Sequence, residues 1–249
     1  ITLAAPKKDF KPLLDKKEKE YYITCMFFGC LIAAGITISC FGLIYGLFIA
    51  LYVALFHLMF VSHIRGNGVH VSKDQFPKID SIVDRMCKRL ELGYRPDVYV
   101  LQQGGALNAM ATRFTKRRFI VLYSDLIEGC EDDKQLEMIV GHEIAHLKLG
   151  HLNFSQHFVM LSMFIPFLYQ AYSRAREANC DALGLYACND LKNAQHALLL
   201  LSCGKKMHKE VNLAAYHKHG ADLESQGWMQ FARLLSFYPY LYERVERLE

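Results

Sequence analysis

Charged residues are missing from one long part of this 249-residue chain. Residues 23–61 contain no Asp, Glu, Lys or Arg and are almost entirely apolar. As one helix, this run would be roughly twice as long as the hydrocarbon core of a bilayer is thick, so two membrane spans joined by a tight turn fit better. Small and polar residues predict the turn near the middle, at Gly35, Thr37, Ser39 and Gly42. The run is too long for a signal peptide.

The chain also lacks a disulfide pattern and a large basic face. No C-x-x-C pair occurs among the eight cysteines, three of which lie in the apolar run. The remaining five are an odd number, which favours a reducing compartment. The net charge is only +4, and acidic residues are interspersed with the basic ones, which argues against nucleic acid as a partner.

Basic residues flank the apolar run on both sides. Six lysines lie within residues 7–19, and His63 and Arg65 follow the run. Under the positive-inside rule the lysine-rich start belongs in the cytoplasm, and a hairpin returns the chain to that side. We therefore expect an integral membrane protein with a basic N-terminal tail over residues 1–20, a transmembrane hairpin of two helices over residues 21–64, and a polar domain over residues 66–249 on the cytoplasmic side.

Small side chains recur at every fourth residue in both halves of the apolar run. They form two ribbons, one of Cys25, Gly29 and Ala33 and one of Gly42, Gly46, Ala50 and Ala54. Such ribbons let helix backbones approach closely in lipid, which favours packing of the two helices on each other. The same ribbons could instead support a homo-oligomer, and Gly and Ala are in any case common in membrane spans.

The polar domain has the pattern of a mostly helical α+β fold with a small sheet. Residues 72–90 predict a helix that begins with a capping box of Ser72 and Gln75. The segments 97–101 and 117–123 are rich in β-branched and aromatic residues and predict strands, with a loop between them. From Asp132 the pattern is helical, with breaks near Gly150, Asn189, Gly204 and Gly220.

One helical segment, MIVGHEIAHLKLGH, carries the pattern of a metal site. His142 and His146 are four residues apart, so their imidazoles project from one face of a helix and can reach a single ion. Glu143 is offset by about 100°, which places its carboxylate beside the ion, where a base can take a proton from a metal-activated water. The alternative is a chance match on an ordinary helix. The apolar residues that flank the motif argue against this alternative, because they would bury the histidines in a core.

A catalytic zinc ion needs a third protein ligand and one open position. The segment REANCDALG offers Glu177 as that ligand, and Asp181, one turn later, can fix the tautomer of a ligand histidine. His151 is a rival ligand. Its position beside Gly150 instead indicates a cation at the end of a helix, where the helix dipole favours positive charge.

These motifs resemble those of the HtpX-type membrane-bound zinc metallopeptidases, a gluzincin family that also includes CAAX prenyl endopeptidases. Four segments match in order: GALNAMATRF, GHEIAHLKLGH, REANCDALG and YPYLYERVERL. The resemblance covers residues 68–249, and the hairpin fits it as well. It implies that residues 66–249 form a gluzincin-type zinc metallopeptidase domain. The family tends to have further membrane segments before the third ligand, but residues 158–169 are short and contain Pro166, which indicates a buried or interfacial helix.

The resemblance also implies roles for single residues. One zinc ion would be bound by His142, His146 and Glu177, with Glu143 as the general base and Asp181 holding a ligand. Asn108 and Ala109 would lie beside the substrate backbone, and Arg244 would pair with an acidic group near the ligands. Where the family has a histidine, this chain has Tyr238. Its hydroxyl could stabilise the developing oxyanion, or the ring could simply pack.

The sequence therefore predicts a membrane-anchored zinc endopeptidase that hydrolyses peptide bonds in protein or peptide substrates. By resemblance alone, damaged membrane proteins are a plausible substrate class, which would be a role in membrane-protein quality control. A prenyl-protein protease of the CAAX type is the first alternative. A zinc-stabilised membrane scaffold that binds partners without cleaving them is the second, although a purely structural zinc is more often closed by four protein ligands.

Overall fold

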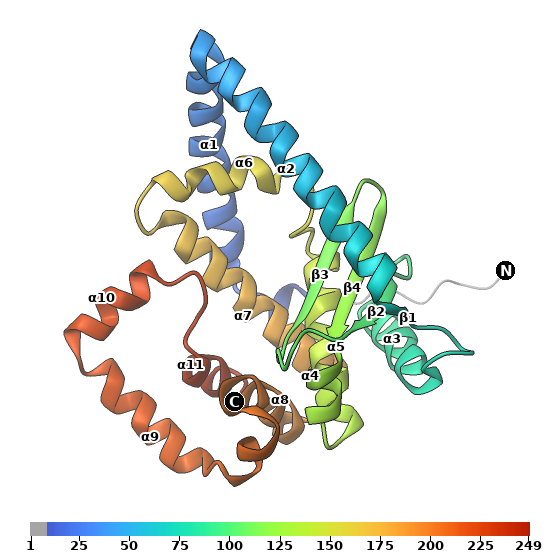
Figure 1. The fold of residues 1–249 in the computed structure, drawn as a ribbon. Coiled ribbons are helices and arrows are strands. Elements are labelled where there is room, and N and C mark those ends of the chain that lie inside the picture. Colours follow the sequence, from blue (N-terminus) through green and yellow to red (C-terminus); the bar gives the residue numbers. More distant parts are fainter. Residues whose placement is uncertain (1–8) are drawn as a thin grey trace, which may run out of the picture.

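The computed structural model describes residues 9–249, so the first part of the predicted basic tail lies outside the described residues. The described chain is mostly helical, with one four-stranded sheet (Figure 1). Its main helices are α1 (Lys16–Ile38), α2 (Cys40–Asn67), α3 (Pro77–Arg89), α4 (Ser124–Gly129), α5 (Asp133–Lys148), α6 (Gln156–Leu161), α7 (Leu168–Cys188), α8 (Leu191–Met207), α9 (Leu213–Glu224), α10 (Gly227–Leu235) and α11 (Leu241–Glu246). The strands are β1 (Val69–His70), β2 (Asp97–Leu101), β3 (Ala109–Phe114) and β4 (Arg117–Tyr123), and the short 3-10 helices are η1 (Lys11–Leu13), η2 (Ser162–Phe164) and η3 (His208–Glu210).

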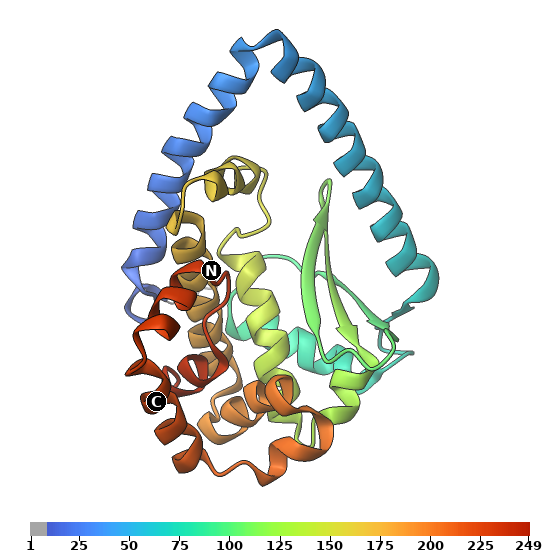
Figure 2. The ribbon, with the colours of Figure 1, turned by 60° about the vertical axis from the view of Figure 1, so that its left-hand side comes forward.

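Helices α1 and α2 are both long and apolar enough to cross a membrane. They meet at Ser39, inside the predicted turn, where the Ser39 hydroxyl accepts a hydrogen bond from the Gly42 N–H at 3.2 Å. From that point the two helices diverge, with α6 nearer to α1 and the sheet nearer to α2 (Figure 2). Their large apolar side chains are mostly exposed, as expected of helices whose solvent is lipid.

The prediction that the two ribbons of small residues pack on each other holds only beside the turn, where Gly42 and Gly46 of α2 lie close to Ile36 of α1. Gly29 of α1 faces α6 instead, and a Cβ atom there would lie 1.9 Å from the carbonyl oxygen of Phe158. The expected helix over residues 158–169 is also not continuous, because α6 ends at Leu161 and α7 begins only at Leu168, after Pro166. This segment is too short to cross a bilayer as a helix, yet it packs against the apolar part of α1.

The sheet has the order β1-β2-β4-β3, with β2 and β4 parallel and the outer pairs antiparallel. Strands β2 and β4 have the predicted bounds. The predicted loop between them is partly wrong, because it contains β3, whose sequence AMATRF has few β-branched residues. One face of the sheet packs on the last turns of α2 through Val61 and Ile64.

Helix α3 begins five residues later than predicted. Pro77 occupies its first turn, where the missing N–H costs nothing, and the residue before it, Phe76, is in the left-handed region. Ser72 and Gln75 exchange two backbone hydrogen bonds in a turn and form no capping box. The predicted break at Gly220 is also wrong, because this glycine lies inside α9 and allows the Tyr242 ring to approach.

Glycines set the distance between α5 and α7, the two helices that carry the candidate metal ligands. A Cβ atom on Gly184 would lie 2.9 Å from the Met138 sulfur, and one on Gly141 would lie 3.2 Å from the Ala187 Cβ. No larger side chain fits at Gly184 without a shift of α5. This close approach brings the polar face of α7 against the histidines of α5.

Candidate metal centre

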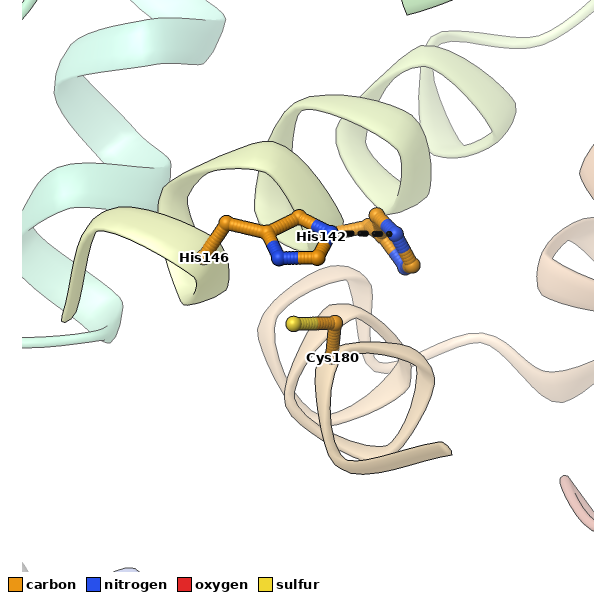
Figure 3. Close-up of side chains that lie close together, drawn as sticks. All are labelled: His142, His146 and Cys180. Atoms are coloured by element: carbon orange, nitrogen blue, oxygen red, sulfur yellow. Dashed lines mark hydrogen bonds between the residues drawn. The ribbon is translucent and has the colours of Figure 1, made fainter. Parts of the chain in front are cut away.

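The two histidines of the motif lie on one face of α5, one turn apart (Figure 3). Asp132 caps this helix by accepting a hydrogen bond from the Lys134 N–H at 2.8 Å, so the helix begins where the motif needs it. The Nε2 atoms of His142 and His146 are 3.2 Å apart. Both rings are nearly buried, and burial lowers the pKa of His146 well below its usual value, which keeps that ring neutral.

Glu177 of α7 reaches the same point from the opposite helix. Its Oε2 lies 3.4 Å from His142 Nε2, and its Oε1 lies 3.7 Å from His146 Nε2. Ligand atoms about 2.0–2.1 Å from a tetrahedral zinc ion are roughly 3.3 Å from one another, so the donor atoms are spaced as zinc requires. Burial alone would raise the pKa of Glu177, but the hydrogen bond from His142, with the positive charge of that ring, holds this pKa below its usual range.

Cys180 is a further candidate ligand that the sequence did not suggest. Its sulfur and the ligand nitrogens of His142 and His146 all lie within 4.8 Å of one another (Figure 3). A thiol must lose its proton to bind zinc, and burial raises the pKa of Cys180 well above its usual value. The Cys180 sulfur also lies 3.6 Å from His151 Nδ1. Glu177, which contacts both imidazoles as a carboxylate, is therefore the better third ligand.

Asp181 and Arg244 hold the other nitrogen of His142. The distance from His142 Nδ1 to Asp181 Oδ1 is 2.8 Å. Arg244 of α11 donates to the same carboxylate from Nε at 2.8 Å and from Nη2 at 2.7 Å. Burial opposes a charge on His142, but the hydrogen bonds to Asp181 and Glu177 outweigh it and raise the pKa of His142 to about 10. In the metal-free site His142 therefore carries a proton on Nε2, at the position where the nitrogen would otherwise bind a metal ion.

His151 follows α5 as expected, but it is not an exposed helix-end cation. Its side chain is almost fully buried, and its Nδ1 lies 2.9 Å from His146 Nδ1, the nitrogen that faces away from Glu177. Its Nε2 lies 2.7 Å from Glu18 Oε1, in the first turn of α1. Glu18 is a residue that sequence reasoning missed, since no local pattern connects positions 133 residues apart.

Glu143, the candidate base, lines a cavity of about 310 Å³ next to the histidines. Its carboxyl group is buried near the backbone of Ala111, and burial raises its pKa above the usual value. Asn108 and Ala109 line the same cavity from the start of β3, and Tyr238 lines it before α11. Burial, followed by the nearby charge of Glu177, raises the pKa of Tyr238, so its hydroxyl keeps its proton.

Residues 73–169 match the family model described as Peptidase family M48. Over these residues the chain is similar to that peptidase family. This match confirms the resemblance seen in the sequence, and it includes the whole His142–His146 motif. Glu177, Asp181, Tyr238 and Arg244 lie beyond the matched residues, so their part in the site rests on geometry and on motif resemblance.

Two curated relatives share part of this domain. Over 60 residues the chain is 38% identical to a protein described as "CAAX prenyl protease 1 homolog" from Oryza sativa subsp. japonica, and 35% identical to one of the same description from Arabidopsis thaliana. Each match covers 24% of this chain but only 14% of the relative. No solved structure matches the chain at a comparable level.

Proposed function

We propose that this protein is a membrane-anchored zinc endopeptidase whose single zinc ion is bound by His142, His146 and Glu177. One observation carries the proposal: three donor groups from two helices converge with separations of 3.2, 3.4 and 3.7 Å. Zinc bound by three protein ligands depresses the pKa of a water molecule and polarises a carbonyl group. The residues around it supply the proton transfers and the positioning.

Glu143 is the general base in this proposal. It is adjacent to His142 in α5 and lines the same cavity, so its carboxylate faces the space beside the ligands. Burial raises its pKa above the usual value, which makes the carboxylate a stronger proton acceptor. Glu143 takes a proton from the attacking water and returns it to the nitrogen of the leaving amine. Its two oxygen atoms suit this exchange.

Strand β3 and Tyr238 position the substrate. Among the described strands β3 pairs only with β4, so its other edge is available to an extended peptide once the side chains of His57 and Asn108 release the Arg113 carbonyl and the Ala109 N–H. Asn108 and Ala109 stand where this edge reaches the cavity. The Tyr238 hydroxyl, protonated and lining the same cavity, donates a hydrogen bond to the carbonyl oxygen as negative charge develops on it.

The hairpin of α1 and α2 anchors residues 66–249 to the membrane in this proposal, with the cavity on the cytoplasmic side. The lysines before the apolar run support this orientation. The described cysteines outside the hairpin are free thiols, which suits a reducing compartment: Cys87, Cys130, Cys180, Cys188 and Cys203. Because the domain is anchored, only substrates at or near the bilayer can reach the cavity. We therefore propose damaged membrane proteins as substrates, which would give the protein a role in membrane-protein quality control.

A prenyl-protein protease is the second candidate. It is favoured by both curated relatives, whose descriptions name a CAAX prenyl protease. The short region of similarity includes too little of either relative to carry the substrate over to this chain. Both candidates use the same ligands and the same base, so only the substrate separates them.

Peptide hydrolysis by the purified full chain tests the proposal. Unfolded casein and a prenylated peptide are each incubated with wild type, with Glu143→Gln, and with wild type plus a zinc chelator. Loss of the base is expected to reduce the rate about 10²–10⁴-fold, and chelation to abolish cleavage. The matched control is Glu246→Gln, which removes an exposed carboxylate of α11. Cleavage that survives in Glu143→Gln would contradict the mechanism, and cleavage of the prenylated peptide alone would select the second candidate.

A further inference from the structure

Helix α1 contacts the candidate metal centre through a chain of buried hydrogen bonds. Glu18 Oε1 lies 2.7 Å from His151 Nε2, and His151 Nδ1 lies 2.9 Å from His146 Nδ1. The His151 side chain is 1% exposed and that of Glu18 is 14% exposed, so little water competes for these bonds. The contact joins the first turn of an apolar helix to a ligand of the proposed zinc ion.

The Glu18 carboxylate at one end of this series of hydrogen bonds fixes the direction of each bond. A carboxylate can only accept, so His151 donates from Nε2 to Glu18. A neutral His151 then has a lone pair on Nδ1, which accepts the proton that His146 carries on its own Nδ1. This tautomer of His146 leaves the lone pair of Nε2 free, and Nε2 is the atom that faces His142 and Glu177.

Asn179 holds Glu18 in place from the opposite side. It lies on α7 between the proposed ligand Glu177 and Asp181, and its Nδ2 donates a hydrogen bond to Glu18 Oε2. The same amide accepts a hydrogen bond from the Asp15 N–H at 2.7 Å and donates to the Asp15 carbonyl at 3.3 Å. The start of α1 is therefore fixed to the helix that carries the third ligand.

We propose that Glu18 and His151 are positioning residues of the metal centre, so that the first apolar helix completes the site as well as anchoring it. They do for His146 what Asp181 does directly for His142. This inference rests on zinc ligation by His146 in the proposed function. Loss of the hydrogen-bond partner of a ligand histidine typically weakens metal binding 10–100-fold.

Zinc affinity of the full chain in detergent, measured by competition with a chromogenic chelator, tests this role without any substrate. Glu18→Gln removes the charge at nearly constant shape, and the matched control Glu20→Gln removes an exposed carboxylate two residues along the same helix. We expect Glu18→Gln to bind zinc at least tenfold more weakly than Glu20→Gln. The absorption spectrum of the cobalt-substituted protein should shift as well, because the His146 ring is less firmly oriented.

A double variant shows whether Glu18 acts through His151. In a His151→Phe background the hydrogen bonds that connect Glu18 to His146 are already lost, so Glu18→Gln should weaken zinc binding no further. Equal zinc affinity of Glu18→Gln and Glu20→Gln would overturn the proposal, and so would additive losses in the double variant. If His151→Phe does not fold, the first comparison still decides. If the wild-type protein binds zinc and the variants lose affinity as expected, but no substrate is cleaved, the proposed peptidase activity is wrong and the positioning role of Glu18 and His151 is still supported.

A second, independent observation concerns α10, which presents an apolar surface outside the hairpin. Its large apolar side chains are exposed: Trp228, Phe231, Leu234 and Leu235. The charged residue of this helix, Arg233, forms an ion pair with Glu243 at 2.8 Å. Arg174 of α7 fixes the end of α10 by donating to the carbonyls of Arg233 at 2.9 Å and Ser236 at 2.7 Å.

The contacts of α10 set its level along the apolar helix α1. The Phe231 ring packs edge-on against Phe167, with 6.2 Å between the centroids, beside the connection of α6 to α7 (Figure 1). The next residue, Leu168, contacts Cys25 of α1, whose sulfur lies 4.0 Å from the Leu168 carbonyl oxygen. Cys25 is the third residue of the uncharged run. The surface of α10 is thus level with the point where α1 enters lipid.

We infer that α10 lies in the interfacial layer of the bilayer, with Trp228 and Phe231 among the acyl chains. Phe167, which contacts Phe231, is exposed as well, and so are Met163 and Phe164 of η2, which packs against α1. An amphipathic helix with Trp, Phe and Leu on one face is typical of this location. The occupant of the surface is lipid, and α10 orients the domain with respect to the membrane.

Trp228 is the single tryptophan of the chain, so its fluorescence reports on this helix directly. The full chain is reconstituted into phosphatidylcholine vesicles with and without bromine on the acyl chains. We expect brominated lipid to quench Trp228 at least twofold. In the control, Trp228→Phe with Tyr94→Trp, the reporter lies in the loop between α3 and β2 and should not respond. Quenching by aqueous iodide without quenching by brominated lipid would overturn the proposal. Protection from both quenchers would also overturn it and would indicate a second protein copy on this surface.

Discussion

Helix α5 and the hairpin of α1 and α2 have opposite patterns of burial. In α5 the buried side chains include Glu137, His142 and Glu143, all of them polar or charged. In the hairpin the exposed side chains are mostly large and apolar. The buried residues are few, and include Cys25 and Gly29 of α1 and Val61 and Ile64 in the last turns of α2. Each pattern is unfavourable for a helix in water on its own, because buried charges need partners and exposed apolar surface needs a cover.

The two patterns are resolved by different neighbours. The polar groups of α5 have partners within the protein. Glu137 binds Arg85 and Lys134, His142 contacts Asp181 of α7, and His146 contacts His151 in the segment after α5. The apolar side chains of the hairpin have few protein neighbours, and both helices are long and apolar enough for lipid to cover them. Buried polarity therefore marks the chemistry, and exposed apolar surface marks the anchor.

The largest effect is expected where a buried charge loses its partner. Asp181→Ala leaves the Arg244 guanidinium buried without its carboxylate, which should destabilise the fold by about 3–5 kcal/mol. Asp133→Ala breaks an ion pair with Lys78 that is at least half exposed and should cost no more than about 1 kcal/mol. Denaturant unfolding of both variants in detergent measures the contrast. Similar losses would mean that burial does not separate the two pairs.

Tyr238 tests whether the cavity beside α5 is equipped for transition-state charge. Tyr238→Phe removes one hydroxyl and keeps the ring. If the phenol donates to the developing oxyanion, kcat should fall about 100-fold, with KM little changed. Steady-state kinetics on a cleavable peptide measures this split, and Tyr240→Phe is the control within the same segment. A rise in KM alone would assign Tyr238 to substrate packing.

Two glycines of α1 test the anchor itself. A Cβ atom at Gly29 would clash with the Phe158 carbonyl, whereas at Gly35 nothing lies within 4 Å. Gly35→Ala should stabilise the helix slightly, because alanine is the better helix former. Gly29→Ala should instead separate α1 from α6 at a cost of about 1–3 kcal/mol. Thermal unfolding in detergent gives the sign of each change. Stabilisation by both substitutions would show that α6 does not pack on α1 at this depth.

The sequence was sufficient wherever one local feature decides the structure. The absence of charge over residues 23–61 predicts both long apolar helices, and β-branched runs predict β2 and β4 with their bounds. The spacing of His142 and His146 places both rings on one face because helix geometry allows nothing else. Strand β3 was predicted as part of a loop because its alanines have little preference for strands. It is a strand because it pairs with β4.

The support of the site was harder to predict. The contact of His151 with Glu18 joins positions far apart in the sequence, and the lysine-rich surroundings of Glu18 indicate only a solvated helix start. His151 was expected at the end of a helix, which is correct, but its burial depends on α1 and α7 packing over it. Long-range packing of this kind leaves no periodic pattern in a single sequence.

The smallest expected effect concerns the proton that α5 holds in the absence of metal. The hydrogen bonds to Asp181 and Glu177 raise the pKa of His142 to about 10. In the metal-free protein, protonated His142 therefore stabilises the fold below the unfolded pKa of 6.5, and this stabilisation is lost as the pH rises through about 10.

Zinc and this proton compete for His142 Nε2, so zinc binding should release about one proton. Zinc affinity should therefore rise about tenfold per pH unit from about pH 6 to about pH 8. Chelator competition at several pH values measures the slope, and calorimetry in two buffers measures the proton. In Asp181→Asn the slope should flatten, because the hydrogen bond to an ionised carboxylate that raises the pKa of His142 is gone. An affinity independent of pH in the wild type would mean that the buried imidazoles are already neutral, and α5 would then hold its polar groups by hydrogen bonding alone.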